Sequence, residues 1–262
     1  LVGRYRHSGR AKVVVQGDVH GEQVKMKFPT ELTEKSKGAK YAFVEKLWAV
    51  RRVGEIIDQI DLHGRNEELL DEMIYLSRKH GILTPYTSFL ADENSNVRDL
   101  DLARRRVGDQ LEGLKEESGE FGFRQRVLKS ALQSAGGIGG LSGSGAAPNK
   151  GLADLQSATP AFGVPGQSTN ADGTVRFKRA NAEKAEAVRN LRQVGSKSFY
   201  LEGDVWVDSM ASDDQVDKPM AVERFSKQYF DLAANFGKEL GPVLQLKGKL
   251  LVILDGKAYL FD

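Results

Sequence analysis

The strongest hydrophobic pattern of the chain lies between residues 47 and 60. Apolar residues recur there at steps of three and four, at Leu47, Val50, Val53, Ile56, Ile57 and Ile60. This spacing places them on one face of an amphipathic helix, and that face must be buried. His63 and Gly64 follow and predict the end of the helix, because glycine accepts the left-handed conformation that commonly ends helices.

A second helix is predicted directly afterwards. Asn66 is suited to cap it, and Glu67 and Glu68 place negative charge near the positive end of the helix dipole. Its expected inward residues are Leu69, Met73 and Leu76, and it is expected to end at Arg78, Lys79 and His80 before Gly81. The two segments therefore predict a helical hairpin. Because Pro85 disfavours helical geometry at Thr84, residues 86–90 are predicted to form a short strand.

Alternating apolar positions predict strands near the start of the chain. Residues 10–16 and 23–28 alternate and are separated by the turn-forming pairs Gly17-Asp18 and His20-Gly21; the apolar positions are Val13, Val15, Val24, Met26 and Phe28. Farther along, residues 97–117 predict a charged amphipathic helix, which residues 121–132 could extend. Its apolar positions are Val97, Leu100, Val107, Leu111 and Leu114.

The composition changes between residues 134 and 174, where glycine, alanine, serine and proline dominate. Few large apolar residues occur there, so the segment cannot offset its ordering entropy and is expected to be a linker or an extended arm. The predicted parts are therefore a strand and helical-hairpin region (1–92), a charged helix (93–133), the linker (134–174) and a small α+β module (175–262). The expected fold class is α+β.

Inside the terminal module, the pattern predicts a short helix at residues 180–191 and a longer one at residues 226–236. Strands are expected at residues 198–201, 204–207, 250–254 and 258–261. Asp255-Gly256, between the last two strands, is a strong signal for a tight hairpin turn.

The charge pattern of the 262 residues excludes some partners. The net charge is +2 and both signs are interspersed, so no basic arm for nucleic acid is present. No apolar run is long enough to cross a bilayer, and we expect no membrane span. The chain has no cysteine, which excludes disulfides and thiolate metal sites without deciding the compartment.

Two segments imitate metal loops. Residues 208–212, DSMAS, nearly spell the D-x-S-x-S loop that binds magnesium, but Met210 stands where a hydroxyl is needed. Asp92, Asn94 and Asn96 imitate the start of a calcium loop that lacks its glycine and its glutamate. A polar turn and a helix cap are the favoured interpretations, and no metal or catalytic residue is assigned. His63 and His80 are interpreted as helix-end residues, too far apart to share a metal.

Two groups of side chains remain as candidate binding residues. Tyr200, Trp206 and Tyr229 could line a ligand groove, although in so small a module aromatic residues more commonly form the core. Arg104, Arg105 and Arg106 could contact a polyanion. Because consecutive helical residues point in different directions, solvation of a helix face or pairing with Glu and Asp three or four residues away is the favoured alternative.

The run LSRKHGILTPYTSFLADE (76–93) resembles the segment that follows the von Willebrand factor type A (vWA) domain in inter-alpha-trypsin inhibitor heavy chains and their bacterial VIT-domain relatives. The opening LVGRYRHSGRAKVVVQGDVHGE resembles the strands directly after that domain. VGSKSFYLEGDVWVDS and ERFSKQYFDLAANFGKEL resemble a small terminal module of some bacterial members. The resemblance covers roughly the first ninety and the last seventy residues.

The resemblance implies that the chain is the back part of a longer protein with a vWA domain upstream. In that case the chain is a noncatalytic scaffold of an adhesion or assembly protein, and magnesium belongs to the upstream domain rather than to this chain. The implied partners are that domain and a protein or cell-surface ligand, with self-assembly as a further option, in the bacterial envelope or outside the cell. The alternative is an accessory region of an envelope hydrolase or processing factor whose active site lies upstream.

Overall fold

The computed structural model describes residues 3–33, 42–92, 96–115, 130–132, 164, 166–170, 172–178 and 184–262. Its first part contains a two-stranded hairpin and a group of helices, namely β1 (Gly9–Val19), β2 (Glu22–Leu32), α1 (Ala42–His63), α2 (Glu67–His80), the 3-10 helix η2 (Ser88–Ala91) and α3 (Leu100–Lys115). Helices and sheets are both prominent, which confirms the predicted α+β class.

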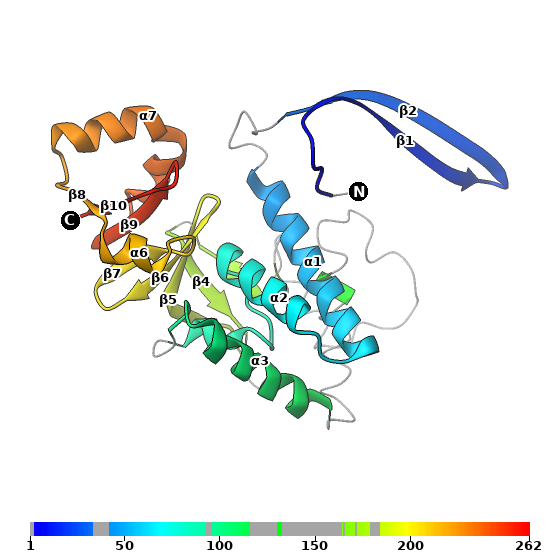
Figure 1. Cartoon of the computed structure of the whole chain (residues 1–262), viewed down its shortest axis with the longest axis horizontal. Coiled ribbons are helices and arrows are strands. Elements are labelled where there is room, and N and C mark those ends of the chain that lie inside the picture. Colours follow the sequence, from blue (N-terminus) through cyan, green and yellow to red (C-terminus); the bar gives the residue numbers. More distant parts are fainter. Residues whose placement is uncertain are drawn as a thin grey trace.

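The second part is an eight-stranded mixed sheet with two helices. Its elements are β3 (Gln167–Thr169), β4 (Thr174–Phe177), β5 (Glu186–Val194), β6 (Lys197–Glu202), β7 (Val205–Asp208), α6 (Asp213–Asp217), β8 (Met220–Val222), α7 (Lys227–Val243), β9 (Lys249–Leu254) and β10 (Lys257–Phe261). The strand order is β3-β4-β5-β6-β7-β9-β10-β8, and only β7–β9 and β10–β8 are parallel pairs. Figure 1 shows α1, α2 and α3 beside this sheet and α7 at its other end.

The predicted helical hairpin is confirmed in detail. All six apolar residues of the α1 stripe are buried. Asn66 caps α2 through its side-chain oxygen, which accepts hydrogen bonds from the backbone N–H groups of Glu68 and Leu69. Gly81 ends α2 in the left-handed conformation. In α2, Met73 and Leu76 are buried as predicted, but Leu70 is buried in place of the only partly buried Leu69.

The large sheet carries a core on each face. Phe199 and Tyr200 are neighbours on β6, and successive strand residues point to opposite faces. Tyr200 joins the core formed by α1, α2, η2 and α3 with β4 and β5, whereas Phe199 joins a second core beneath α7. The helical part and the sheet therefore share one hydrophobic core.

Two segments differ from the sequence prediction in type. Residues 86–90, predicted as a strand, form a turn and η2. The hydroxyl and backbone groups of Thr84 and Thr87 bond to one another, and the Thr87 hydroxyl also donates to the carbonyl of Ile82. Such local hydrogen bonds compete with strand pairing. The second difference is β5, because residues 186–191 lie within a predicted helix but pair with β4 and β6.

The boundaries also differ in the middle of the chain. Residues 167–169 were expected in the linker but form β3, and β4 begins at Thr174, the last residue of that expected linker. Their pairing in the large sheet supplies the hydrogen bonds that the composition alone does not suggest. Most of the predicted linker, and most of the helical extension predicted at residues 121–132, lie outside the described residues.

The remaining strands and helices confirm the predictions with modest changes in length. The strands expected at residues 10–16, 23–28, 198–201, 204–207, 250–254 and 258–261 are present. Asp255 and Gly256 both have positive φ, as a tight hairpin turn requires. The helix expected at residues 226–236 extends to Val243, past a non-helical backbone at Phe236.

Candidate functional site

The β1–β2 hairpin has one apolar and one charged face. Val13 lies opposite Phe28 and Val15 lies opposite Met26, and residues directly opposite each other share a face. By the two-residue period of a strand, the apolar face also contains Ala11 and Val24. The other face carries mostly charged and polar residues, with Val14 among them: Arg10, Lys12, Gln16, Asp18, Lys25, Lys27 and Glu31.

The apolar face of this hairpin is largely uncovered. Val13 is 46% exposed, Met26 48% and Phe28 50%. Figure 1 shows the ribbon of β1 and β2 extending away from the helices and the large sheet. Near the base of the hairpin, the guanidinium of Arg4 lies 5.1 Å from the centre of the Trp48 ring on α1. The hairpin is therefore an apolar surface presented to the outside from an anchored base.

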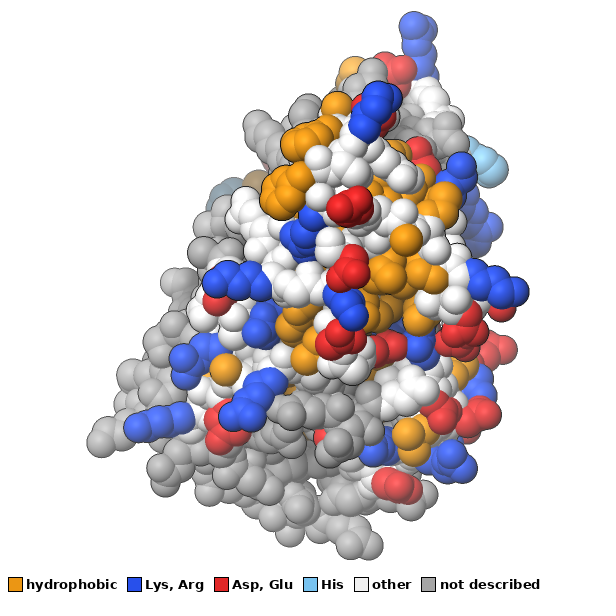
Figure 2. Space-filling model, turned by 90° about the vertical axis from the view of Figure 1, so that its left-hand side faces the viewer, with side chains coloured by type: hydrophobic (Ala, Val, Ile, Leu, Met, Phe, Trp, Pro, Cys, Tyr) orange, Lys and Arg blue, Asp and Glu red, His pale blue; other side chains and the backbone are white. Residues whose placement is uncertain are grey.

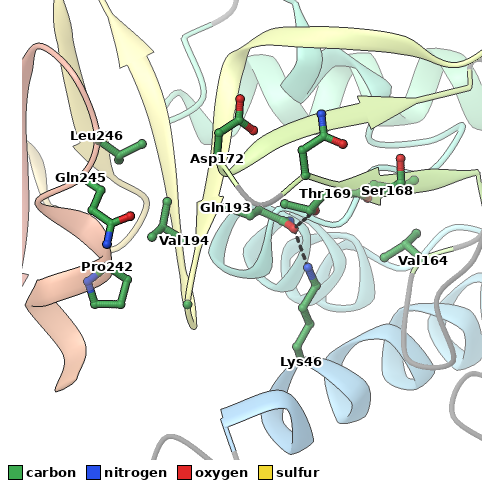
Figure 3. A pocket seen from close by; sticks show the side chains of 13 residues that line it. Lys46, Val164, Ser168, Thr169, Asp172, Gln193, Val194, Pro242, Gln245 and Leu246 are labelled. Atoms are coloured by element: carbon green, nitrogen blue, oxygen red, sulfur yellow. Dashed lines mark hydrogen bonds between the residues drawn. The ribbon is translucent and has the colours of Figure 1, made fainter.

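A cavity of about 560 Å³ lies between α1, the segment around β3, the β5–β6 turn and the carboxyl end of α7. Figure 3 shows Lys46 reaching into it from α1 toward Gln193. Polar groups line one part of the cavity, among them Thr169 and Asp172, and apolar side chains line the rest: Val164, Val194, Pro242 and Leu246.

Lys46 is the charged group at the base of this cavity. Its ammonium donates a 2.6 Å hydrogen bond to Oε1 of Gln193. No carboxylate of the described part of the chain lies within 4 Å of it. Burial lowers the pKa of Lys46 to about 8, which leaves the side chain mostly charged at neutral pH.

Gln193 positions this lysine and also holds the helices on the sheet. Its Oε1 accepts a second hydrogen bond from the hydroxyl of Thr169 at 2.8 Å. Its Nε2 donates to the backbone carbonyls of His80 and Gly81, at 2.9 and 2.7 Å. Two further amides from the sheet serve the same region, because Gln167 bonds to Gly81 and Leu83, and Asn190 donates to the carbonyls of Leu90 and Asp92.

His80 at the end of α2 is buried close to this network. Its Nε2 lies 3.8 Å from a carboxylate oxygen of Glu45, which also accepts a 2.6 Å hydrogen bond from Lys79. Burial lowers the pKa of His80 to about 4; the charges of Lys79 and Lys46 act in the same direction, and Glu45 opposes them. His80 is therefore neutral in the folded protein at physiological pH. His63 is exposed and bonds to the carbonyl of Gln59.

The buried neutral state of His80 predicts a loss of stability in mild acid. Below pH 6.5 the unfolded chain takes up a proton at this residue, but the folded chain does not until the pH approaches 4. Stability is therefore lost as the pH falls from 6.5 toward 4, by about 2 kcal/mol at pH 5. Urea unfolding at pH 7 and pH 5 should show a loss larger by this amount in the parent chain than in His80→Gln. Equal losses in both proteins would contradict the prediction.

The predicted aromatic groove is not formed by the three residues proposed for it. Tyr200 is buried in the core under the helices, and its hydroxyl donates to the carbonyl of Arg78. Trp206 pairs with Leu201 across β6–β7 and so points to the opposite face of the sheet, where the guanidinium of Arg192 covers its ring. Tyr229 is partly buried in that second core. These residues contribute to two cores, in agreement with the favoured interpretation.

The three consecutive arginines of α3 also lie in different surroundings. Arg104 makes two 2.6 Å hydrogen bonds to the carboxylate of Asp71 on α2, which hold the pKa of Asp71 below its usual value. Arg106 pairs with Asp92 at 3.3 Å. Arg105 is exposed. Two of the three are thus held by carboxylates. Only the 3.2 Å contact of Arg104 with Asp101 joins neighbours on the helix as the sequence favoured, because Asp71 and Asp92 lie 33 and 14 positions away in the chain.

Asp208, at the start of the metal-like DSMAS segment, is fully engaged by the protein. Its carboxylate accepts hydrogen bonds from Lys197 at 2.9 Å and from the backbone N–H groups of Ile253 and Met210 at 3.1 and 3.0 Å. The segment forms a polar turn after β7, as favoured from the sequence. Among the described residues no cluster of three or more potential metal ligands occurs. Asn94, from the calcium-like segment, lies outside them.

The hydrophobic side chains of the terminal module are partly exposed around α7. Figure 2 faces this end of the molecule and shows hydrophobic side chains between charged ones. The ring of Tyr229 contacts those of Phe225 and Phe230, with ring centres 5.5 and 5.3 Å apart. Phe225 and Phe230 are 74% and 56% exposed, so this aromatic cluster contributes to the surface as well as to the core.

The sequence prediction missed the cavity. Lys46 continues the α1 stripe through Val50, Val53 and Ile57 at helical spacing, so a lysine on an otherwise apolar face was the available signal. Gln193 lies 147 residues away in a segment where a strand was not expected until residue 198. Thr169 lies in the predicted linker.

Comparison with known proteins gives no relative for this chain: no family model, no curated protein and no solved structure matches it. Within the described residues, no helix has the length and apolar character to span a membrane.

Proposed function

We propose that this chain is a noncatalytic scaffold of a vWA-containing adhesion or assembly protein, and that the β1–β2 hairpin joins it to the preceding part of that protein. The uncovered apolar face of the hairpin carries the proposal. A half-apolar antiparallel sheet normally packs its apolar face on a core, but Val13, Met26 and Phe28 remain about half exposed here. Covering that face is the simplest way to stabilise it.

The edges of the hairpin support the same kind of partner. β1 and β2 pair only with each other in the part of the chain that the structure describes. A two-stranded hairpin without further strands is marginally stable in water, and its outer edges offer unpaired backbone groups. A β-rich partner can both cover the apolar face and extend the sheet. According to the family resemblance, the preceding part carries the vWA domain and this chain forms the β-rich support around it, so the hairpin would contact that domain.

In the proposed protein, ligand binding and structural support belong to two different parts. The preceding vWA domain would hold the magnesium ion and bind a protein or a cell-surface ligand. This chain would hold that domain in place through the hairpin and supply the sheet and helices as a rigid body. The envelope or the cell exterior is the corresponding location.

Two substitutions on β1 separate docking from a general loss of stability. Val13 and Val14 are equally exposed, at 46% and 44%, but lie on opposite faces of the hairpin. We expect Val13→Lys to weaken binding of this chain to the separately produced preceding region at least tenfold, because a charge would enter an apolar interface. Val14→Lys adds the same charge to the polar face and should have little effect. Titration calorimetry measures both.

Equal weakening by the two variants would contradict docking through the apolar face. Hydrogen exchange gives a second criterion, because β1 and β2 should exchange rapidly in the isolated chain and slowly in the complex. Ligand capture by the complete protein should be lost when magnesium is chelated. A catalytic signature in the preceding region, in place of D-x-S-x-S after an apolar strand, would instead favour the accessory region of an envelope hydrolase.

A further inference from the structure

We propose that the cavity beside Lys46 binds a small monocarboxylate with an apolar body. This inference is independent of the proposed scaffold function, because it concerns a different surface and requires no preceding domain. The cavity volume of about 560 Å³ lies within the range of small-molecule sites, which is roughly 300–1,000 Å³. Its walls come from four separate parts of the chain, so the folded protein forms the cavity before any ligand arrives.

The charge of the cavity determines the sign of the ligand. The ammonium of Lys46 has three N–H donors, and Gln193 accepts from one of them. Within the described part of the chain no carboxylate pairs with it. By contrast, the neighbouring Lys79 is paired with Glu45 at 2.6 Å. A bound anion would supply the partner that Lys46 lacks.

The position of Lys46 makes its charge unfavourable for the stability of the ligand-free protein. Burial disfavours the ammonium and lowers its pKa to about 8. Lys46 also lies near the amino end of α1, the positive end of the helix dipole, where cations are disfavoured. An apolar residue there would continue the buried stripe of Val50, Val53 and Ile57. A charge in such a place is typical of a functional group.

Asp172 lines the same cavity but does not neutralise Lys46. Its two carboxylate oxygens accept hydrogen bonds from the backbone N–H and the hydroxyl of Thr174, both at 2.9 Å. These bonds hold the pKa of Asp172 below its usual value. Figure 3 shows the carboxylate directed away from the Lys46 ammonium. Asp172 therefore stays ionised, but it is exposed at the cavity rim, where water screens its charge, and Thr174 holds its carboxylate. A ligand can then pair directly with the Lys46 ammonium.

The remaining lining selects a carboxylate over a phosphate. A phosphate carries close to two charges and usually requires arginines or several backbone N–H groups. The cavity offers one ammonium, with the side-chain amides of Asn170 and Gln245 nearby. Val194, Pro242 and Leu246 form an apolar wall on one side of the cavity, which fits a hydrocarbon body, and Val164 lies on the opposite side. One charge, a few hydrogen-bond donors and an apolar wall match a monocarboxylate.

Hexanoate and hexanamide provide a matched pair of probes, because they differ mainly in charge. Binding is measured at pH 7 from chemical shifts of the labelled full chain. We expect hexanoate to saturate shifts around Lys46 with a dissociation constant on the order of 1 mM, and hexanamide to bind at least tenfold more weakly. Lys46→Met should abolish the preference for hexanoate, whereas Lys257→Met, which removes an exposed lysine on β10, should leave it unchanged.

Lys46→Met is expected to fold, because Oε1 of Gln193 still accepts the Thr169 hydroxyl. A second variant, Gln245→Glu, adds a negative charge at an exposed position of the cavity rim and should weaken hexanoate binding about threefold. The proposal is overturned if hexanoate does not bind at roughly 50 mM. It is equally overturned if hexanamide binds as well as hexanoate, or if Lys46→Met retains the preference.

Discussion

Replacing Asp208 with alanine is expected to destabilise the protein by about 2–4 kcal/mol. The side chain of Asp208 is 1% exposed and that of its partner Lys197 is 15% exposed. The carboxylate also accepts from the backbone N–H groups of Ile253 and Met210. Alanine would leave two buried backbone N–H groups without this acceptor. Lys197 would keep only its 3.2 Å pair with the more exposed Glu239 and its hydrogen bond to the carbonyl of Ile253. A loss of that size is a large fraction of the 5–15 kcal/mol typical of whole domains.

Asp204→Ala is the matched control for this prediction. Asp204 lies in the β6–β7 turn and pairs with Lys249 at 2.9 Å, but its side chain is 74% exposed. Exposed pairs contribute about 0–1 kcal/mol, so this substitution should have a small effect. Urea unfolding followed by circular dichroism measures both variants. Similar losses in the two proteins would show that the buried network around Asp208 does not hold the strands together.

The helical hairpin could be predicted because its signals are local. Asn66 caps α2 and Gly81 ends it through bonds to residues within a few positions in the chain. The α1 stripe has an unambiguous helical period, and its burial follows from that period. The Asp255-Gly256 turn is similarly local, since both residues adopt the positive φ that the sequence predicts.

The segments predicted wrongly depend on distant partners. β5 contains Glu186, Ala187 and Arg189, residues that favour helices, but the pairing with β4 and β6 overrides this preference. β3 pairs with β4 although its surroundings in the sequence resemble a linker. At residues 82–92 the backbone is satisfied by local threonine hydroxyls and by amide side chains of the sheet, so no strand partner is needed.

The sequence predicted the hairpin surface in part, but it did not predict the cavity. The alternation of Val13, Val15, Met26 and Phe28 predicted the two strands, but only the structure shows that these residues share one face and that this face is uncovered. The cavity could not be predicted from local patterns, because Lys46 and Thr169 reach Gln193 only when the helices pack on the sheet. A lysine on an apolar helix face indicates a special position in the fold, but it does not indicate which residue the lysine contacts.

Gln193→Ala is expected to destabilise the protein by about 3 kcal/mol. The residue is 8% exposed, and its amide donates to two carbonyl groups at the end of α2 while accepting from Lys46 and Thr169. Alanine would leave the His80 carbonyl without this donor and the Lys46 ammonium without its acceptor, whereas the Gly81 carbonyl would keep the hydrogen bond from Gln167. Gln228→Ala, at an exposed position of α7, serves as the control and should change stability by less than about 0.5 kcal/mol. Urea unfolding measures both, and equal losses would contradict the assigned role.

Gln193→Glu distinguishes the contribution of the amide N–H donor from that of the amide oxygen acceptor. The carboxylate keeps the size of the side chain and still accepts from Lys46 and Thr169, but an oxygen replaces Nε2 and faces the carbonyl oxygens of His80 and Gly81. If the donor is the essential half, this variant should be at least as unstable as alanine, and hydrogen exchange should accelerate first at the end of α2. A glutamate variant as stable as the parent would show that pairing with Lys46 outweighs the anchoring of α2. Water cannot replace the lost donor at these buried carbonyl groups. We therefore expect loss of the amide N–H donor to account for most of the destabilisation.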